Sequence, residues 1–564
     1  MTHQLVIKGG VVVDGTGAPA READVAVDGG RIVAVGAVAD RGEVEIDAGG
    51  RLVTPGWVDI HTHYDGQATW DPMLSPSCWH GVTTVVMGNC GVGFAPVAPD
   101  KREWLVALME GVEDIPGTAL HEGIRWAWES VPEYLDALES MPRVLDVAAQ
   151  VPHGALRGYV MGDRGADHNE VPTAEEIVRM GRLAREGIAA GALGFTTSRT
   201  VNHKSSDGRH TPSLTATRDE LVGIAREIGA GGRGVIEAVA DFTDLDAEFG
   251  LLLAMVEASG RPLSISIMQS DARPDGWRQL LGLISEAADR GLVVRGQVAS
   301  RAVGVLMGLQ STTNPFVRTR AYQEIAALAL ADKVARWKAP DFRDAMLAEM
   351  AAPDAFAMGW GKLYQLGDPP NYEPSPEQSI AARAQREGRT PAALAYELML
   401  ERDGRELLYV PFNNYTSGNL DAVREMITHP YTVPGLGDAG AHCGLLCDGS
   451  FPTYLLSHWG KDRPQGRLPV EWLVKRQTKD TAELVGLNDR GVLAPGRKAD
   501  LNVIDLDALG LTPPEIVHDL PAGGKRLVQR AGGYAATVVS GSVVMRDGEP
   551  TGAMPGRLVR GAQA

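Results

Sequence analysis

Two histidines separated by one residue, His61 and His63, are the first side chains whose types and spacing suggest chemistry. They follow the apolar run WVDI, which is typical of a β-strand. Residues i and i+2 of a strand point to the same side, so both imidazoles can bind one metal ion. An ordinary polar face is the alternative interpretation. The strand end and the following Tyr64-Asp65-Gly66 favour a metal site.

Cys90 and Asp438 are two further candidates, and each lies at the end of an apolar run. Cys90 belongs to the segment GNCG, and a thiolate beside Zn²⁺ gives up its proton. A small buried hydrophobe is the alternative for this cysteine. Asp438 belongs to GLGDAGAH and could pass a proton from an attacking water to a leaving nitrogen. An aspartate that caps a turn is the alternative there.

Eight apolar segments alternate with helical stretches through the middle of the chain, which is typical of βα units around a parallel sheet. Eight such strands predict an α/β fold that closes into a (β/α)8 TIM-like barrel. The reactive groups of such a barrel lie at the carboxyl ends of its strands, where His61, Cys90 and Asp438 are expected. The predicted strands are residues 57–61, 81–89, 143–151, 192–198, 234–240, 263–269, 292–298 and 432–438.

The two ends of the chain differ from this middle part. Short runs of β-branched residues, interrupted by glycine and aspartate, occupy both of them. Asp28-Gly29-Gly30 stands between two alternating runs, where a hairpin turn would lie. We expect the two ends to pair with each other in a small β unit.

Two of the intervening helices have clear start signals. Thr173 with Glu176, and Thr217 with Glu220, each fit a capping box, in which hydroxyl and carboxylate accept hydrogen bonds from opposite backbone donors.

A long insertion separates the last two predicted strands. Residues 299–431 are too many for a simple crossover, and they contain helical stretches and a segment rich in aromatic residues and proline. Long barrel insertions usually cover the site, so we expect a lid. A contact between subunits is the alternative.

Composition and charge exclude several classes of partner. The formal net charge is −18, from 54 basic and 72 acidic residues, which argues against a nucleic-acid partner. The sequence shows neither a basic leader nor an apolar stretch of about 18 residues, so we expect a cytoplasmic protein without membrane binding. Its four cysteines predict neither a disulfide scaffold nor a structural zinc site. A small-molecule substrate is the expected partner, and homo-oligomer formation is left open.

The segment VTPGWVDIHTHYDGQ, which carries the two histidines, resembles the signature of the amidohydrolase superfamily. GVTTVVMGNCG, HGALR, GALGFTTSR, GLGDAGAH and DRGVLAPGRKADLNVID then resemble, in that order, its D-aminoacylase or N-acyl-D-amino-acid deacylase branch. The resemblance covers nearly the whole chain. It implies a metal-dependent hydrolase barrel at 57–478, flanked by a β-sandwich that residues 1–56 and 479–564 form together.

The resemblance also implies a ligand set. In that branch a pair of histidines, a cysteine, two further histidines on strands five and six, and an aspartate on strand eight surround the metal. The matching residues here are His61, His63, Cys90 and Asp438.

Two positions depart from that pattern. Glu237 and Gln269 stand where the histidines of strands five and six are expected. Glutamate can bind zinc, whereas a neutral amide is a poor ligand and more naturally hydrogen-bonds a substrate. Strand four reads TTSR and has no lysine that could bridge two metals. We therefore expect one Zn²⁺, held by His61, His63, Cys90 and Glu237.

Several other polar side chains near the predicted strand ends could bind the substrate. An arginine can hold a carboxylate with two parallel hydrogen bonds, although a surface position is the alternative for each. Tyr64 and Trp79 more naturally line the pocket or fill the core. The candidates are Arg199, Arg301, Arg157 and His442, with His153 beside Arg157 and with His203, Lys204 and His210 in a polar loop after strand four.

Three functions are therefore weighed. The leading hypothesis is a zinc-dependent hydrolase of a linear amide, which deacylates an N-acyl D-amino acid with Asp438 as proton shuttle. The second keeps the barrel and the metal but changes the bond to a lactone, a cyclic imide or a carbon–carbon link, because of Glu237 and Gln269. The third is a barrel without catalysis that acts as a binding protein.

Overall fold

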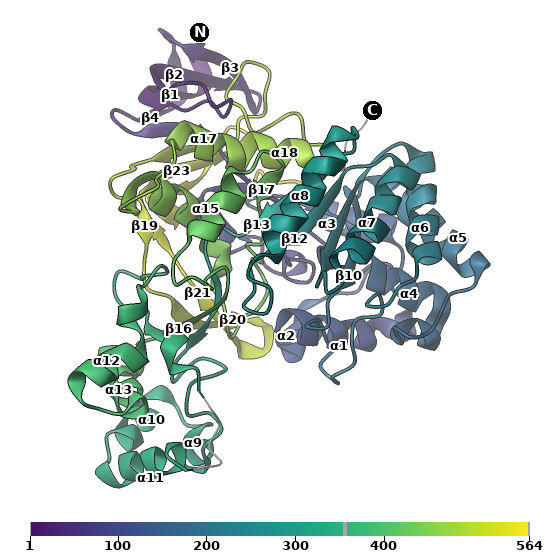
Figure 1. The fold of residues 1–564 in the computed structure, drawn as a ribbon. Coiled ribbons are helices and arrows are strands. Elements are labelled where there is room, and N and C mark those ends of the chain that lie inside the picture. The colour runs from purple at the N-terminus through teal and green to yellow at the C-terminus, as the bar shows by residue number, and fades with distance from the viewer. Residues whose placement is uncertain (1, 353–357, 562–564) are drawn as a thin grey trace.

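The computed structural model describes residues 2–352 and 358–561. Residues 1, 353–357 and 562–564, which fall in the predicted end units and insertion, lie outside the described residues. Figure 1 shows the N-terminal strands at the top, an α/β body in the middle and a lobe of helices at the bottom left.

The eight predicted strands of the body are all present, and they pair in parallel. Only Gln150 separates β8 (Asp146–Ala149) from β9 (Val151–Pro152). A parallel bridge between Thr62 and Ala439 joins the segment after β6 (Trp57–Asp59) to the segment after β17 (Thr432–Pro434). The strands thus follow one another in the order that the barrel prediction requires. One sheet contains β6 (Trp57–Asp59), β7 (Val82–Met87) and β8 (Asp146–Ala149). The other contains β9 (Val151–Pro152), β10 (Gly194–Arg199), β11 (Val235–Ala240), β12 (Leu263–Ile267), β13 (Val294–Val298) and β17 (Thr432–Pro434).

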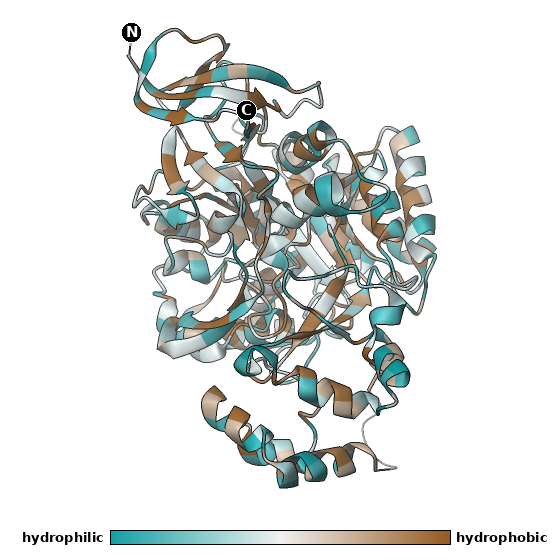
Figure 2. Ribbon diagram, turned by 90° about the vertical axis from the view of Figure 1, so that its left-hand side faces the viewer, coloured by the Kyte–Doolittle hydropathy of each residue, from teal (hydrophilic) through white to brown (hydrophobic). Residues whose placement is uncertain are grey.

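Helices surround these strands, as βα units require. β7 is buried at every position, which is typical of a strand that is covered on both faces. Figure 2 shows the apolar residues concentrated in the strands at the centre of the body. The helices of the body include α1 (Arg102–Glu113), α3 (Val131–Glu139), α4 (His153–Met161), α5 (Ala174–Ala190), α6 (Arg218–Gly231), α7 (Leu245–Ser259), α8 (Gly276–Asp289) and α15 (Asp421–Thr428).

Both predicted helix starts are found, with one difference. Thr173 and Glu176 form a reciprocal capping box at the start of α5. At the start of α6, the Thr217 hydroxyl accepts a hydrogen bond from the backbone of Glu220 at 3.3 Å. The Glu220 carboxylate does not return that bond, because it is buried and pairs with side chains of α4.

The two ends of the chain pair with each other, as expected. One nine-stranded sheet runs in the order β25-β24-β23-β18-β5-β1-β2-β3, and β4 also pairs with β1. Gly29 and Gly30 form the predicted hairpin turn with φ of 57° and 73°, the left-handed region that such turns require. The sheet buries an apolar cluster of its own. Its strands are β1 (Thr2–Val12), β2 (Arg21–Asp28), β3 (Arg31–Gly36), β4 (Arg41–Asp47), β5 (Leu52–Pro55), β18 (Leu501–Ile504), β23 (Tyr534–Val539), β24 (Ser542–Arg546) and β25 (Glu549–Pro550).

The predicted insertion forms the lobe, which has a second apolar core. In this core Trp337 stacks on Tyr396 with ring centroids 4.5 Å apart. Figures 1 and 2 show the lobe extending away from the body. Its elements are β14 (Val303–Met307), β15 (Tyr364–Gln365), β16 (Leu408–Asn413), α9 (Arg320–Ile325), α10 (Leu330–Trp337), α11 (Pro340–Met350), α12 (Ile380–Glu387), α13 (Pro391–Leu398) and α14 (Glu401–Gly404).

In the ranges that the structure describes, no helix is long and apolar enough to cross a membrane.

Candidate metal centre

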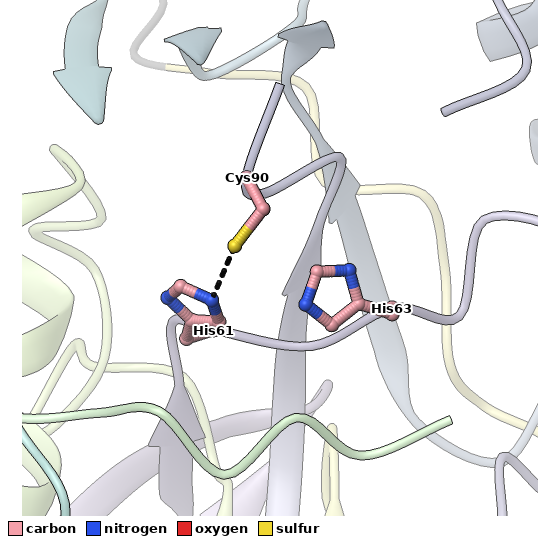
Figure 3. Close-up of side chains that lie close together, drawn as sticks. All are labelled: His61, His63 and Cys90. Atoms are coloured by element: carbon pink, nitrogen blue, oxygen red, sulfur yellow. Dashed lines mark hydrogen bonds between the residues drawn. The ribbon is translucent and has the colours of Figure 1, made fainter. Parts of the chain in front are cut away.

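Four of the predicted site residues meet in one place. His61 Nε2 lies 3.3 Å from Cys90 Sγ and 3.4 Å from Asp438 Oδ1, and His63 Nε2 lies 3.6 Å from the same aspartate oxygen. Figure 3 shows the His61 ring and the Cys90 thiol pointing toward each other, with the His63 ring beside them. These residues follow β6, β7 and β17, so they lie at the carboxyl ends of three strands.

The backbone explains why residues so far apart in sequence converge. The segment after β17 hydrogen-bonds to the segment after β6, with Asp438 N donating to His61 O at 3.1 Å and His63 N donating to Ala439 O at 2.8 Å. On the other side, Thr62 N donates to Val86 O at 3.0 Å. The sheet thus continues past the strands and holds the site residues in register.

The donor atoms fit a metal ion. Bonds of about 2.0–2.3 Å to a tetrahedral ion place neighbouring donors roughly 3.3–3.6 Å apart, which matches the separations in this cluster. One ligand atom from each of His61, His63 and Cys90 lies within 4.8 Å of the others. A set of nitrogen, sulfur and oxygen donors favours zinc among the divalent ions.

The orientation of His61 also suits a metal ligand. Its Nδ1 lies 2.8 Å from Gln297 Oε1, and Gln297 Nε2 donates to Ser264 Oγ at 2.9 Å. An amide oxygen can only accept, so Nδ1 of His61 carries the proton. Its Nε2 therefore presents a lone pair to the cluster, which is the usual arrangement around a bound metal.

Glu237 lies beside the cluster and is 1% exposed. Its Oε2 accepts a hydrogen bond from Cys90 N at 3.0 Å, whereas its Oε1 is buried without a hydrogen-bond partner in the described part of the chain. Burial raises the pKa of Glu237 to about 7. A metal ion would give the second oxygen a partner and favour the charged carboxylate.

Acidic groups dominate the electrostatics of the cluster. Burial and the neighbouring carboxylates raise the pKa of the Cys90 thiol well above its usual value. Burial also lowers the pKa of His63 to about 4. Burial acts against ionisation of Asp438, but the neighbouring His63 and His61 outweigh it and lower the pKa of Asp438. A bound cation would favour the anionic cysteine and carboxylates together.

The backbone at the cluster is strained. Cys90, Asp438 and His442 have φ of 54°, 42° and 51°, a region that residues other than glycine rarely adopt. Gly91 permits the close approach of the GNCG turn to β10, since a Cβ there would lie 2.8 Å from Ser198 N. Strain of this kind is often found where a structure positions reactive groups.

Gln269 has side-chain partners outside the cluster. Its side chain bonds to the loops around it, with Nε2 donating to Pro274 O and Oε1 accepting from Thr416 N. Alternate residues of β12 share a face, and Ser264 on that strand contacts the Gln297 that orients His61. Gln269 lies two residues beyond β12, and its side-chain bonds connect it to Pro274 and Thr416.

The three arginines proposed to bind substrate each pair with a carboxylate of the protein. Arg157 is fully buried and donates to Glu220 Oε2 at 2.7 Å. Arg301 is 1% exposed and lies 3.0 Å from Asp448 Oδ1. Arg199 pairs with Glu248. Arg157 and Arg301 thus have buried internal partners, whereas Arg199 and Glu248 are partly exposed.

We predict that Glu220→Ala lowers the free energy of unfolding by about 3–5 kcal/mol, because it leaves the buried Arg157 without its counter-charge. Urea unfolding measures this. Glu227→Ala is the matched control on the same helix, because Glu227 pairs with Arg185 where both side chains are partly exposed, so we expect less than about 1 kcal/mol. Equal effects of the two substitutions would refute a structural role for the buried pair.

The remaining candidates are distributed around the site. His442 is 25% exposed, and its Nε2 lies 3.8 Å from Glu113 Oε2. His203 Nδ1 lies 2.9 Å from Ser198 Oγ, and burial lowers the pKa of His203 to about 3. The other positions are Lys204 on the surface, His210 half-buried, His153 buried against Thr197 and Glu220, Tyr64 buried with its hydroxyl donating to Ser77, and Trp79 under Arg530.

Two residues at the site were not expected from the sequence. Gln297 lies on a predicted strand, and a polar residue near the end of an apolar run was a usable signal. Glu113 ends α1, outside every motif, and its Oε1 lies 3.3 Å from His63 Nδ1. No sequence pattern connects it with the site.

Comparisons with known proteins show which proteins this chain resembles along its whole length. The D-aminoacylase of Alcaligenes xylosoxydans xylosoxydans is 29% identical over 566 residues, which cover 98% of this chain and 97% of that protein. A solved D-aminoacylase with a binuclear metal centre has a TM-score of 0.66 at 25% identity, over 99% of this chain and 100% of that one. The N-acyl-D-glutamate deacylase of Bordetella bronchiseptica, solved with zinc and a phosphonate inhibitor, gives 0.65 at 25% identity over the same shares. The model of the amidohydrolase family matches residues 44–545, and the chain belongs to that family.

Proposed function

We propose that this amidohydrolase removes the acyl group of an N-acyl D-amino acid. The observation that carries the proposal is the convergence of four side chains, in which His61 lies 3.3 Å from Cys90 and 3.4 Å from Asp438, and His63 lies 3.6 Å from Asp438. The full-length relatives include a D-aminoacylase and an N-acyl-D-glutamate deacylase, which support this substrate class.

The chemistry follows from the positions of the side chains. Zinc in such a site supplies a Lewis acid that polarises the scissile carbonyl and acidifies water. Asp438 is the proton carrier, since its carboxylate lies 3.4 Å from His61 Nε2 and 3.6 Å from His63 Nε2 and is 21% exposed. It takes a proton from the attacking water and gives one to the leaving nitrogen.

We further infer one zinc ion, with His61, His63, Cys90 and Glu237 as its protein ligands. Activation by one metal and attenuation by a second are described for the solved D-aminoacylase. The unpartnered Oε1 of Glu237 supports the fourth ligand.

The strand order supports a closed (β/α)8 barrel at 57–478 with the lobe as its insertion at 299–431. The apolar cluster inside the nine-stranded sheet supports a β-sandwich that 1–56 and 479–564 form together. Whether the lobe is a lid or an oligomer contact, and whether His442 contacts substrate, stay predictions.

A substrate panel tests the function. We expect hydrolysis of N-acetyl or N-formyl D-amino acids, with the L enantiomers much slower, and no turnover of lactones or cyclic imides. Release of the free amino acid is the measurement. Turnover of a lactone or a cyclic imide, with no deacylation of any N-acyl amino acid, would favour the second function instead.

A further inference from the structure

Glu113 is a buried carboxylate that no part of the proposed reaction uses. It is the last residue of α1, and its side chain is 2% exposed. Its two oxygens face two histidines from different parts of the chain. Oε1 lies 3.3 Å from His63 Nδ1, and Oε2 lies 3.8 Å from His442 Nε2. One carboxylate therefore contacts the segment after β6 and the segment after β17.

The contact between Glu113 and His63 brings together two buried polar atoms that have no other hydrogen-bond partner among the described residues. Glu113 Oε1 and His63 Nδ1 are both buried, and apart from each other neither has a hydrogen-bond partner within the described ranges. Buried polar atoms are rarely left in this state, since desolvation without a partner is unfavourable by roughly 1–3 kcal/mol. A small rotation of either side chain would bring the two atoms into a direct hydrogen bond.

The backbone holds Glu113 in this position. His442 N donates to Glu113 O, and Cys443 N donates to Asp114 O at 3.2 Å. Gly444 N donates to Asp114 Oδ2 at 3.1 Å. The end of α1 is therefore fixed to the loop that follows Asp438, which places the Glu113 side chain next to the two histidines.

We propose that Glu113 is a positioning residue that orients His63 through its Nδ1 and holds His442 beside it. Accepting the Nδ1 proton leaves Nε2 of His63 as a lone-pair donor, and this Nε2 is the atom that lies 3.6 Å from Asp438. Gln297 does the same for His61 with a neutral amide. Each histidine of the pair thus has its own acceptor behind it. The inference rests on the proposed function, because it assumes that Nε2 of His63 binds the metal.

The test measures zinc affinity by competition with a coloured chelator, without substrate. Glu113→Leu is expected to weaken zinc binding by about 10- to 100-fold, the usual effect of removing a group behind a ligand histidine. Gln297→Leu is expected to weaken it by a similar factor through His61. Glu113→Gln keeps an acceptor oxygen, so it should restore most of the affinity. Glu110→Gln is the matched control on α1, because Glu110 bonds only to Gly117 N in the described contacts and should leave zinc affinity unchanged.

The outcomes separate this inference from the function itself. Zinc affinity of Glu113→Leu equal to wild type would overturn the role of Glu113 and leave the proposed function standing. A wild-type protein that binds no zinc would overturn both. If Glu113→Leu does not fold, Glu113→Asp withdraws the carboxylate from both rings while it keeps the charge. Weaker zinc binding by that variant would support the inference, and unchanged binding would refute it.

Discussion

Replacing Asp438 by asparagine is expected to lower kcat by about 100- to 10,000-fold, the range for loss of a general acid–base group. The amide has nearly the same shape as the carboxylate but cannot accept a proton from water. KM should change little, because the substitution leaves the histidines and Cys90 in place. Steady-state kinetics on the best N-acyl D-amino acid measures both constants.

The zinc content of the variant and one control variant show whether the loss of kcat comes from the missing carboxylate. Zinc content should stay close to that of wild type, which would exclude simple loss of the metal. Asp271→Asn is the control, since Asp271 is about half exposed and pairs with Lys362 outside the cluster, so its kcat should not change. If Asp438→Asn turns over as fast as wild type, another group carries the proton.

Removal of the metal by a chelator is expected to abolish turnover and to lower the melting temperature, and added zinc should restore both. A ligand present at about 1,000 times its Kd stabilises the fold by about 4 kcal/mol. In His61→Ala, zinc should neither restore turnover nor raise the melting temperature. Calorimetry and metal analysis of the same samples measure the effect.

The control for that variant is His121→Ala, because His121 is 48% exposed and its partner Glu103 lies on the surface. It should behave as wild type. A wild-type protein that zinc neither activates nor stabilises would instead favour the binding-protein hypothesis.

Much of the fold could be predicted because its elements have local signals. The apolar runs, the hairpin glycines and the threonine caps each act within a few residues, and the structure has them where they were expected. The convergence of His61, Cys90 and Asp438 also followed from one rule, since each ends a strand and parallel strands end at the same edge.

Sequence reasoning is weakest where a side chain depends on a partner far away in the chain. Gln269 was assigned to the substrate site, and in the structure its side chain bonds to Pro274 and Thr416. The arginines were assigned by charge, and their carboxylate partners come from helices whose packing the sequence does not reveal. Arg157 meets Glu220 across 63 positions of the chain. Glu113 reaches His63 in the same way, from a helix without any motif.

The antiparallel pairing of β5 with β18 places Pro55 opposite Leu501. After β5 has been synthesised, about 450 further residues must be synthesised before its partner β18 is available. At 5–20 residues per second, that is roughly 20–90 s of synthesis during which the nascent chain has an unpaired strand edge. An unpaired strand edge of this kind is a site of aggregation until its partner strand covers it.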